Sequence, residues 1–297
     1  MKKSDGYLWK AEVLRFVLEA FAAHESLRSA LIFKGARILN LRLGNDFQRE
    51  SFDLDSNLDI NCAVNHPQKE DCRGFLARES ELALKKFFSQ QDPVRFQLES
   101  IKAEVKPPRD NHPFGWTGFS LTIRVIDNEL FGVRGLPSVE FQVAAYERVG
   151  EGAVSDLQLR NGLIVRAQTL ERIAGEKMRA FLTSLPAYFA KVGCHQVGVR
   201  VKDLYDLARI RRRFEIADNA FWRTVGREFR LACESRFVDC AGIETFAENL
   251  DMTRQIYELD RNLPKDIPFK EAWDAVQAAV TRFTEFGILP FTFEIPS

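Results

Sequence analysis

The sequence has no long hydrophobic run. No stretch approaches the roughly 18 consecutive apolar residues that a membrane-spanning helix needs. The segment 11–23 contains Glu12, Arg15 and Glu19, so it lacks the apolar region of a signal peptide. The chain also contains no internal repeat and no low-complexity tract. These absences argue against a membrane protein and against a secreted one.

Cysteine is scarce, and its spacing is irregular. The five cysteines are odd in number and include no C-x-x-C pair. A disulfide framework is therefore not expected, and we predict a reduced, cytoplasmic protein. Cys62, His66 and Cys72 could be imagined around a zinc ion. A fourth ligand is missing and the spacing is irregular, so we do not expect zinc.

The composition is that of an ordinary globular protein. The chain has 297 residues, of which 45% are hydrophobic and 28% charged, enough for one large or two modest domains. We predict two domains, at 1–165 and 166–297. The net charge is zero, but Lys and Arg outnumber Asp and Glu by 16 to 8 in residues 157–236. This basic segment suits a polyanionic partner, and a solvated helix face is the alternative.

Residues 33–55 carry the strongest local pattern. Lys34-Gly35 comes first, an apolar-periodic run follows, and Arg49-x-Ser51-x-Asp53-x-Asp55 closes the segment. This order predicts a turn, a short helix and a strand. Alternate residues of a strand share one face, so Ser51, Asp53 and Asp55 are expected to point the same way. Mg²⁺ is usually held by one or two carboxylates together with substrate phosphates. The alternative is that Asp-x-Asp forms a solvated turn.

Several further strands are expected after a helix at 70–90. Alternating apolar residues and loop signals predict them at 94–101, 118–126, 138–145 and 163–167. Glu140 lies in the third of these and is the best candidate for another carboxylate beside the Asp-x-Asp pair. A half-exposed strand also carries outward Glu residues without function, and that alternative stays open.

The remainder of the chain is predicted to be helical. Thr169 is placed to cap a helix that contains Lys177. The next helix begins near residue 198 and carries Asp203 and Asp206 one turn apart. Four arginines follow within residues 209–213, either as a phosphate-binding cluster or as a solvated face. Three amphipathic helices are expected at 218–237, 243–260 and 268–286. The fold class predicted is therefore α+β, a mixed sheet followed by a helical region.

Three separated motifs resemble one family. They are Lys34-Gly35 with the later R-x-S-x-D-L-D of residues 49–55, the L-E-x-I-x-x-E-K-x-x-A pattern of residues 170–180, and the R-x-K-D-L-Y-D-L pattern of residues 200–207. Together, and in this order, they resemble the AbiEii/AbiGii-type (MenT-like) nucleotidyltransferase toxins of the DNA-polymerase-β-like superfamily. The resemblance implies a polymerase-β-like core with a mixed sheet, completed by helices of the C-terminal region.

The resemblance also implies a reaction. It is the Mg²⁺-dependent transfer of a nucleoside monophosphate from an NTP, with the 3′ end of tRNA as acceptor. The protein would then be the toxin of a toxin–antitoxin or phage-abortive-infection system, with a cognate antitoxin as partner. The basic segment 157–236 would bind the RNA.

The implied site residues fall into three groups. The catalytic group is Asp53, Asp55, Lys177 and Asp203. The nucleotide-binding group is Lys34, Gly35, Arg49 and Ser51. The metal ligands are Asp53, Asp55 and Glu140. Lys177 would stabilise charge on the triphosphate, and Asp203 would hold the acceptor or Lys177 in place. The alternatives are an exposed helix lysine at Lys177 and a helix-terminal charge pair at Asp203.

The sequence departs from the family at one place. The family commonly has Lys-Gly-Gly-Thr, whereas this chain has Lys34-Gly35-Ala36-Arg37. The change removes backbone freedom and a hydroxyl near the phosphates, and it leaves the nucleotide preference open. Two other hypotheses therefore remain. One is nucleotidyl or phosphoryl transfer to a protein or small molecule, and the other is a catalytically silent module that binds a nucleotide or a partner.

Overall fold

The computed structural model describes residues 3–44, 53–107, 116–130, 136–193 and 198–295. The chain divides into two compact units, and each is described by itself. Unit 1 comprises Met1–Leu41, Glu50–Glu147 and Ser155–Gln168, and unit 2 comprises Arg42–Arg49, Arg148–Val154 and Thr169–Ser297. The domain boundary between residues 165 and 166 stays a prediction.

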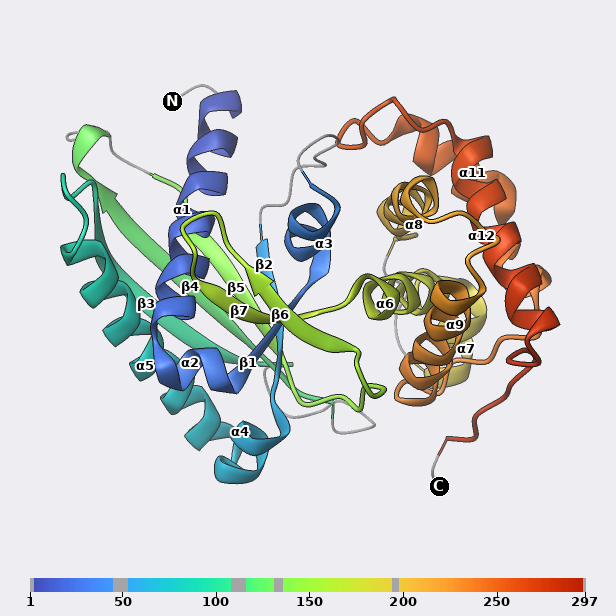
Figure 1. The fold of residues 1–297 in the computed structure, drawn as a ribbon, viewed down its shortest axis with the longest axis horizontal. Helices are drawn as coiled ribbons and strands as arrows, with labels where there is room; N and C mark the ends of the chain where they lie inside the picture. Colours follow the sequence, from blue (N-terminus) through green and yellow to red (C-terminus); the bar gives the residue numbers. More distant parts are fainter. Residues whose placement is uncertain (1–2, 45–52, 108–115, 131–135, 194–197, 296–297) are drawn as a thin grey trace. The chain divides into compact units, whose positions relative to one another are not determined.

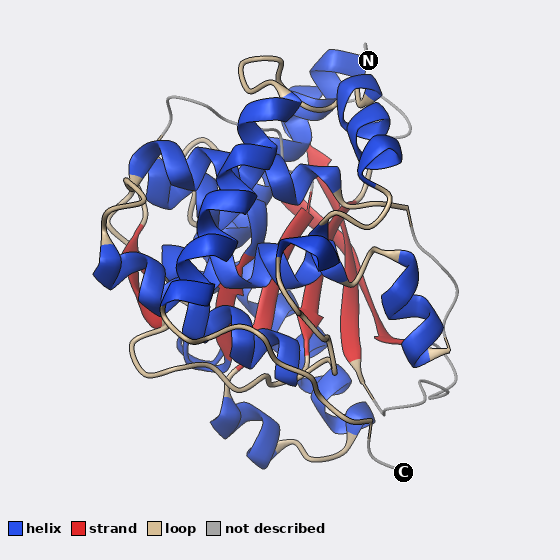
Figure 2. Cartoon of the chain, turned by 90° about the vertical axis from the view of Figure 1, so that its right-hand side faces the viewer, coloured by secondary structure: helices blue, strands red, loops and turns tan. Residues whose placement is uncertain are grey.

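Unit 1 is built on a mixed sheet of seven strands, drawn in red in Figure 2. The strand order is β3-β4-β5-β2-β1-β7-β6. β2 pairs in parallel with β5, and β1 pairs in parallel with β7, whereas β1/β2, β3/β4 and β4/β5 are antiparallel. The strands are β1 Leu31–Lys34, β2 Asp53–Leu58, β3 Phe96–Lys106, β4 Gly118–Asp127, β5 Val139–Ala144, β6 Val154–Gln158 and β7 Ile164–Gln168.

One face of the sheet is apolar and is covered by helices. Side chains alternate between the two faces of a strand, so Leu54, Leu121 and Phe141 share the buried face. Helix α1 (Lys3–Ala23) crosses this face beside α5 (Lys69–Ser89), as Figure 1 shows. The ring centroids of Phe21 and Phe141 are 5.1 Å apart, which fixes α1 on the buried face. Burying such a side chain contributes about 1.5–3 kcal/mol, so this packing anchors the central strands.

Three short helices complete unit 1. They are α2 Glu25–Ala30, α3 Gly35–Leu43, whose last two residues belong to unit 2, and α4 Ile60–Asn65. Helix α4 begins after Asp59, whose carboxylate accepts a hydrogen bond from the backbone N–H of Asn61 at 2.9 Å. This hydrogen bond satisfies one of the free N–H groups at a helix start.

Unit 2 is helical. Its elements are α6 Leu170–Leu182, α7 Pro186–Val192, α8 Val201–Arg213, α9 Asn219–Glu234, α10 Ile243–Phe246, α11 Leu250–Leu259 and α12 Phe269–Glu285. Helix α6 packs on both α8 and α9. It approaches α9 closely at Gly175, where an added Cβ would lie 2.6 Å from the backbone N of Phe229. The core between these helices includes the buried rings of Trp222, Phe229 and Phe283.

The predicted fold class is confirmed: the structure is α+β, with a mixed sheet followed by a helical region. The four strands and the cap at Thr169 were predicted correctly, and the Thr169 hydroxyl accepts a hydrogen bond from the Arg172 N–H at 3.4 Å. The single helix predicted at 243–260 was wrong. Residue Asn249 has φ +56°, a left-handed conformation that separates α10 from α11. β1, β6, α4 and α7 were not predicted, and Lys34, expected in a turn, is the last residue of β1.

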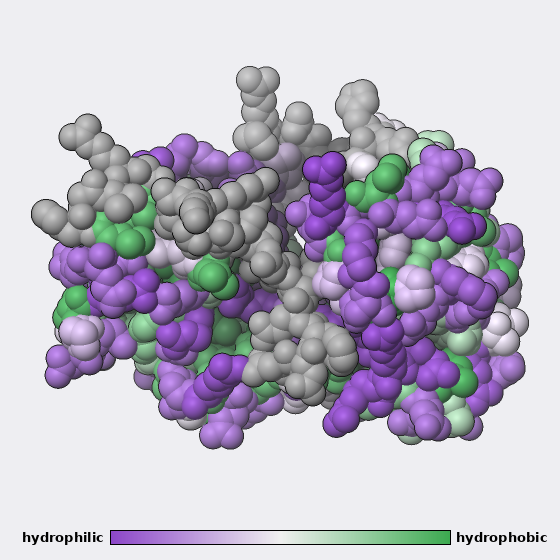
Figure 3. Space-filling view, turned by 90° about the horizontal axis from the view of Figure 1, so that it is seen from above, coloured by the Kyte–Doolittle hydropathy of each residue, from purple (hydrophilic) through white to green (hydrophobic). Residues whose placement is uncertain are grey.

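Among the described residues, no helix combines the length and the apolar character needed to cross a bilayer. On the face that Figure 3 shows, hydrophobic residues form small, separate patches among hydrophilic ones.

Candidate active site

The sheet face opposite α1 is polar, and its register aligns side chains from distant segments. Paired residues on neighbouring strands point to the same side, so the register defines rows across the sheet. The first row contains Glu104, Ser120, Gln142, Asp55 and Lys34. The second row contains Lys102, Thr122, Glu140 and Asp53. Three carboxylates of the predicted site therefore share one face of unit 1.

Asp53 and Glu140 are direct neighbours. They pair between the parallel strands β2 and β5, and neighbouring strands lie about 4.8 Å apart. Both side chains are exposed, and that of Asp55 is half-buried. Asp53, Asp55 and Glu140 thus lie on the polar strand face, as the alternation in the sequence predicts. Arg49 and Ser51, the other polar residues of this motif, lie outside the described residues.

Lys34 and Gly35 stand on the other side of Asp55. Lys34 is the last residue of β1 and pairs with Asp55 across the antiparallel β1/β2 ladder. Gly35 begins α3 with φ +80°, a conformation that favours glycine. A Cβ on Gly35 would lie 3.2 Å from the Cβ and Cγ of Asp55 and closer still to its Oδ2. The Asp55 carboxylate is therefore held at the N-terminus of α3, where the helix dipole favours negative charge.

Arg37 adds a positive charge to this region. It lies in the first turn of α3, at the place where the sequence departs from the family, and its Nη1 donates a hydrogen bond to the Ala11 carbonyl at 3.4 Å. Burial lowers the pKa of Arg37 to about 10, and the negative charge of Asp53 opposes that decrease. Arg37 stays cationic at neutral pH and lies close enough to Asp53 for the two charges to attract.

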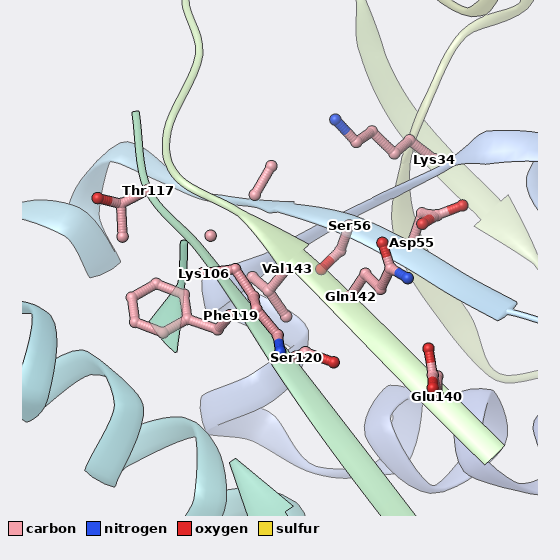
Figure 4. Close-up of a pocket in the computed structure, with 12 residues that line it drawn as sticks. Lys34, Asp55, Ser56, Lys106, Thr117, Phe119, Ser120, Glu140, Gln142 and Val143 are labelled. Atoms are coloured by element: carbon pink, nitrogen blue, oxygen red, sulfur yellow. The ribbon is translucent and has the colours of Figure 1, made fainter. Parts of the chain in front are cut away.

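A cavity of about 540 Å³ opens on the polar face (Figure 4). This volume is in the usual range for small-molecule sites. Lys34, Asp55 and Glu140 lie at one end, Thr117 lies at the other, and Gln142 lies between them. The further lining residues are Ser56, Lys106, Gly118, Phe119, Ser120, Val143 and Ala144.

Among the lining residues, only Lys34, Asp55 and Glu140 were predicted from the sequence, and the polar residues that were missed include Ser120 and Gln142. The signal for Gln142 was present, because the alternation that selects Glu140 also puts Gln142 on the same face. No comparable signal marked Ser120, since a single serine in an alternating strand is common on any solvated sheet.

The chemistry of the carboxylates fits magnesium that arrives with a nucleotide. Mg²⁺ takes oxygen ligands and usually keeps only one or two from protein carboxylates, the others being water and phosphate. Asp53 and Asp55 can supply such a pair. In the part of the chain that the structure describes, no group of three or more His, Cys, Asp or Glu could hold a metal ion by itself. Substrate oxygens would have to complete the coordination.

Unit 2 contains the second predicted group, a buried cluster around Lys177. Its ammonium lies 2.9 Å from Oδ1 of Asp203 and 2.7 Å from Oδ2 of Asp206. The Arg200 Nε donates to Oδ2 of Asp203 at 2.6 Å. Burial raises the pKa of Asp203, but the positive charges of Lys177 and Arg200 outweigh it and hold that pKa below its usual value. Asp203 is therefore ionised at neutral pH.

This geometry tests two of the alternatives left open by the sequence. Lys177 is only 8% exposed, so it is not an ordinary exposed helix lysine. Asp203 contacts Lys177 directly and is also paired with Arg200. Asp206 had been noted only for its spacing from Asp203, and the structure adds it as a second partner of Lys177.

The arginine cluster of residues 209–213 is partly used within unit 2. Arg209 is buried. The Arg212 guanidinium forms ion pairs with Asp266 at 3.2 Å and with Glu271 at 2.5 Å. At these two positions the hypothesis of a phosphate-binding cluster loses its support, because the charges already have partners or are out of reach of solvent.

The match to a protein family spans both units. The model of the family described as nucleotidyl transferase AbiEii toxin, type IV TA system, matches residues 17–286. The comparison with curated proteins returned no match. Members of this family are nucleotidyltransferases, which use an NTP as substrate, and a toxin of such a system has an antitoxin as partner. With nine-tenths of its length matched, including all the site residues described above, this chain belongs to the family of AbiEii nucleotidyl transferase toxins of type IV toxin–antitoxin systems.

Proposed function

We propose that this chain transfers a nucleoside monophosphate from an NTP to the 3′ end of tRNA, with the carboxylates of β2 at the centre of the reaction. One observation carries the proposal. Asp53 pairs with Glu140, and Asp55 pairs with Lys34, on one sheet face beside a cavity of about 540 Å³. Carboxylates and an ammonium group gathered at a pocket of this size suit a nucleotide with its metal ion.

Four residues of this face have a role in the proposed reaction. Asp53 and Asp55 would hold Mg²⁺, which when bound neutralises phosphate oxygens and stabilises the leaving pyrophosphate. The Lys34 ammonium would bind a phosphate oxygen. Glu140 would accept the proton of the acceptor hydroxyl while the hydroxyl oxygen forms a bond to the α-phosphorus. The bond from the α-phosphorus to pyrophosphate breaks in the same step, so atoms and charge balance.

Five further residues enter the proposal from the family resemblance. Gly35, Arg49 and Ser51 would contact the phosphates through backbone and side-chain donors. Lys177 would stabilise negative charge during the transfer. The 2.9 Å ion pair between Lys177 and Asp203 supports Asp203 as the residue that positions the lysine ammonium.

An RNA acceptor is supported by the surface of α9. Arg223, Arg227 and Arg230 are all exposed and lie on one side of this helix. The guanidinium carbons of Arg223 and Arg230 lie 4.3 Å and 5.9 Å from the ring centroids of Phe286 and Phe291. At such distances the ring face attracts the guanidinium. Arginines so arranged bind backbone phosphates without reading the base sequence, as a general RNA surface requires.

The test is a labelling experiment with matched variants. The protein is incubated with each α-³²P-labelled NTP, Mg²⁺ and total tRNA, in parallel with Asp53→Asn and with Asp156→Asn. Asp156 is an exposed aspartate of β6 and serves as the control. We expect label on tRNA with wild type and Asp156→Asn but not with Asp53→Asn.

The other outcomes would each overturn part of the proposal. Label on protein alone would replace the tRNA acceptor with a protein acceptor. Label that persists in Asp53→Asn would remove the β2 carboxylates from the reaction. No label with any of the four nucleotides would favour the silent binding module.

A further inference from the structure

The floor of the cavity contains a hollow that the proposed reaction does not use. A third row crosses the sheet beside the row of Asp55, and it contains Lys106, Gly118, Ala144 and Asn57. The two central positions, Gly118 and Ala144, carry at most a methyl group. Both line the cavity. Between the longer side chains of Lys106 and Asn57, the sheet surface is therefore open to a ligand.

Apart from Lys106, the polar side chains around the hollow are neutral. Gln142 and Ser120 lie in the adjacent row, and Thr117 lies at the end of the cavity. Gln142 is exposed and lies between Asp55 and Ser120 in the register, as Figure 4 also shows. An amide offers two donors and an acceptor, and a hydroxyl offers one donor and two acceptor lone pairs. Such groups recognise hydrogen-bonding edges and give no special attraction to phosphate.

The lysines at this end are already paired. The Glu104 carboxylate forms ion pairs with Lys102 at 2.6 Å and with Lys106 at 3.0 Å. Three of the charged residues that line the cavity, Lys34, Asp55 and Glu140, lie at the opposite end. That end suits a triphosphate that arrives with Mg²⁺, because it offers both carboxylates and an ammonium group. At the near end, Lys106 is the one charged residue among the described lining residues and pairs with Glu104, so the remaining lining groups suit an uncharged part of the same ligand.

The spacing of the two ends matches one nucleotide. Residues two apart in a strand are separated by about 7 Å, so Ala144 lies that far along β5 from Gln142, which is level with Asp55. This distance leaves room for a ribose between phosphates near Asp55 and a base over Ala144. A flat nucleobase would lie on Gly118 and Ala144 with its edge toward Gln142.

We propose that the hollow over Gly118 and Ala144 is the nucleobase subsite for the NTP, and that Gln142 determines which NTP is preferred. The inference rests on the proposed function, because it takes the nucleotide as the ligand of this cavity. Ser120 is next to Gln142 in the same row and supplies a second hydrogen-bonding group. A glutamine amide can pair with a base through two hydrogen bonds, as it does with adenine, and such a pair discriminates strongly against bases of another pattern.

The test measures binding, independently of transfer. Adenosine, guanosine, cytidine, uridine and inorganic tripolyphosphate are each titrated into the protein by calorimetry. Wild type is expected to prefer one nucleoside. Gln142→Leu should lower that preference at least about tenfold, the scale of one bidentate hydrogen-bonded pair, and should leave tripolyphosphate binding unchanged. Gln142→Glu, which can only accept, should shift the preference toward cytidine, whose amino group donates.

Two more variants separate the subsite from general effects. Ala144→Leu fills the hollow without removing a polar group, so it should weaken all four nucleosides and spare tripolyphosphate. Gln97→Leu makes the same change as Gln142→Leu at another exposed strand position, one that does not line the cavity, and should behave as wild type.

The proposal is overturned if Gln142→Leu keeps the wild-type preference, if Ala144→Leu binds all nucleosides normally, or if wild type binds no nucleoside. Failure of the proposed function looks different, because it shows itself in the labelling experiment: label on protein alone, label that survives Asp53→Asn, or no label with any nucleotide.

Discussion

The carboxylate of Asp55 occupies the space that a side chain on residue 35 would fill. Gly35 has no Cβ, and its φ of +80° turns the chain from β1 into α3 directly beside that carboxylate. A glycine is therefore required at this position of the Lys-Gly motif for a structural reason, because it leaves room for Asp55, a proposed metal ligand. This role is separate from any interaction of the Gly35 backbone with phosphate.

Gly35→Ala is expected to abolish most of the transfer activity while the protein stays folded. The added methyl group would displace the Asp55 carboxylate, and the left-handed backbone would add a strain of about 1–2 kcal/mol. Gly162→Ala is the control, since Gly162 has φ +85° and open space around it. Labelled transfer and the melting temperature are measured for both. Equal loss of activity in the two variants would show that backbone strain, and not the clash with Asp55, is responsible.

Lys177→Met is expected to destabilise the protein by about 3–5 kcal/mol, because it removes the ammonium group that contacts both buried carboxylates, Asp203 and Asp206. Replacing both aspartates with asparagine in the same variant should restore part of the loss. Denaturant unfolding gives the free energies. Lys270→Met removes an exposed pair with Asp274 and should change stability little. A folded Lys177→Met protein of wild-type stability would contradict the buried cluster.

Stability should fall at acid pH in a way that depends on Asp203. The pKa of its folded-state carboxyl lies below the usual value of 3.8, so its contribution is complete above that value. The contribution is lost as the pH falls from about 4 through the folded-state pKa. The free energy of unfolding, measured between pH 7 and pH 3, should therefore drop more steeply for wild type than for Asp203→Asn below pH 4. Parallel curves would rule out this carboxyl as the cause.

Two helix glycines should respond oppositely to the same substitution. Gly175→Ala would force a Cβ to within 2.6 Å of the Phe229 backbone, so it should cost about 1–3 kcal/mol by pushing α6 from α9. Gly74→Ala, in α5 with nothing within 4 Å, should stabilise the protein by about 0.5–1 kcal/mol. Thermal unfolding of the two variants distinguishes them. A stabilising Gly175→Ala would mean that the two helices can separate without cost.

The arginines of α9 should govern RNA affinity and its salt dependence. Replacing Arg223, Arg227 and Arg230 with glutamine should weaken tRNA binding and reduce the slope of log K against log salt, by about 0.7–0.9 for each phosphate that is no longer neutralised. NTP binding should not change. The control replaces three exposed arginines elsewhere, Arg28, Arg78 and Arg254. An unchanged slope in the α9 variant would remove this surface from RNA binding.

The sequence predicted which strand face each site residue occupies better than it predicted which strands lie side by side. Alternation within each strand was enough to put Asp53 and Asp55 on one face and Glu140 on the polar face of its own strand. It could not show that β5 lies beside β2, because strand order depends on packing between distant segments, such as Phe21 with Phe141. The row that joins Asp53 to Glu140, and the cavity beside it, appear only after that order is known.

The burial of Lys177 could not be predicted from the sequence either. A lysine in an amphipathic helix is usually solvated, and the motif around it gives no measure of exposure. The spacing of Asp203 and Asp206 was the one local sign that two carboxylates could meet a single ammonium. Only the packing of α6 on α8 shows that Lys177 is the group that both carboxylates contact.

The position of β2 between β1 and β5 also matters during synthesis of the chain, because its two neighbours are translated at different times. β1 precedes β2 closely along the chain, but β5 follows it only after α5, β3 and β4. A nascent polypeptide that has not yet been extended to Glu140 can pair Lys34 with Asp55 and still lacks the neighbour of Asp53. A fragment that ends before β5 would therefore lack Glu140, one of the carboxylates that the proposed reaction uses.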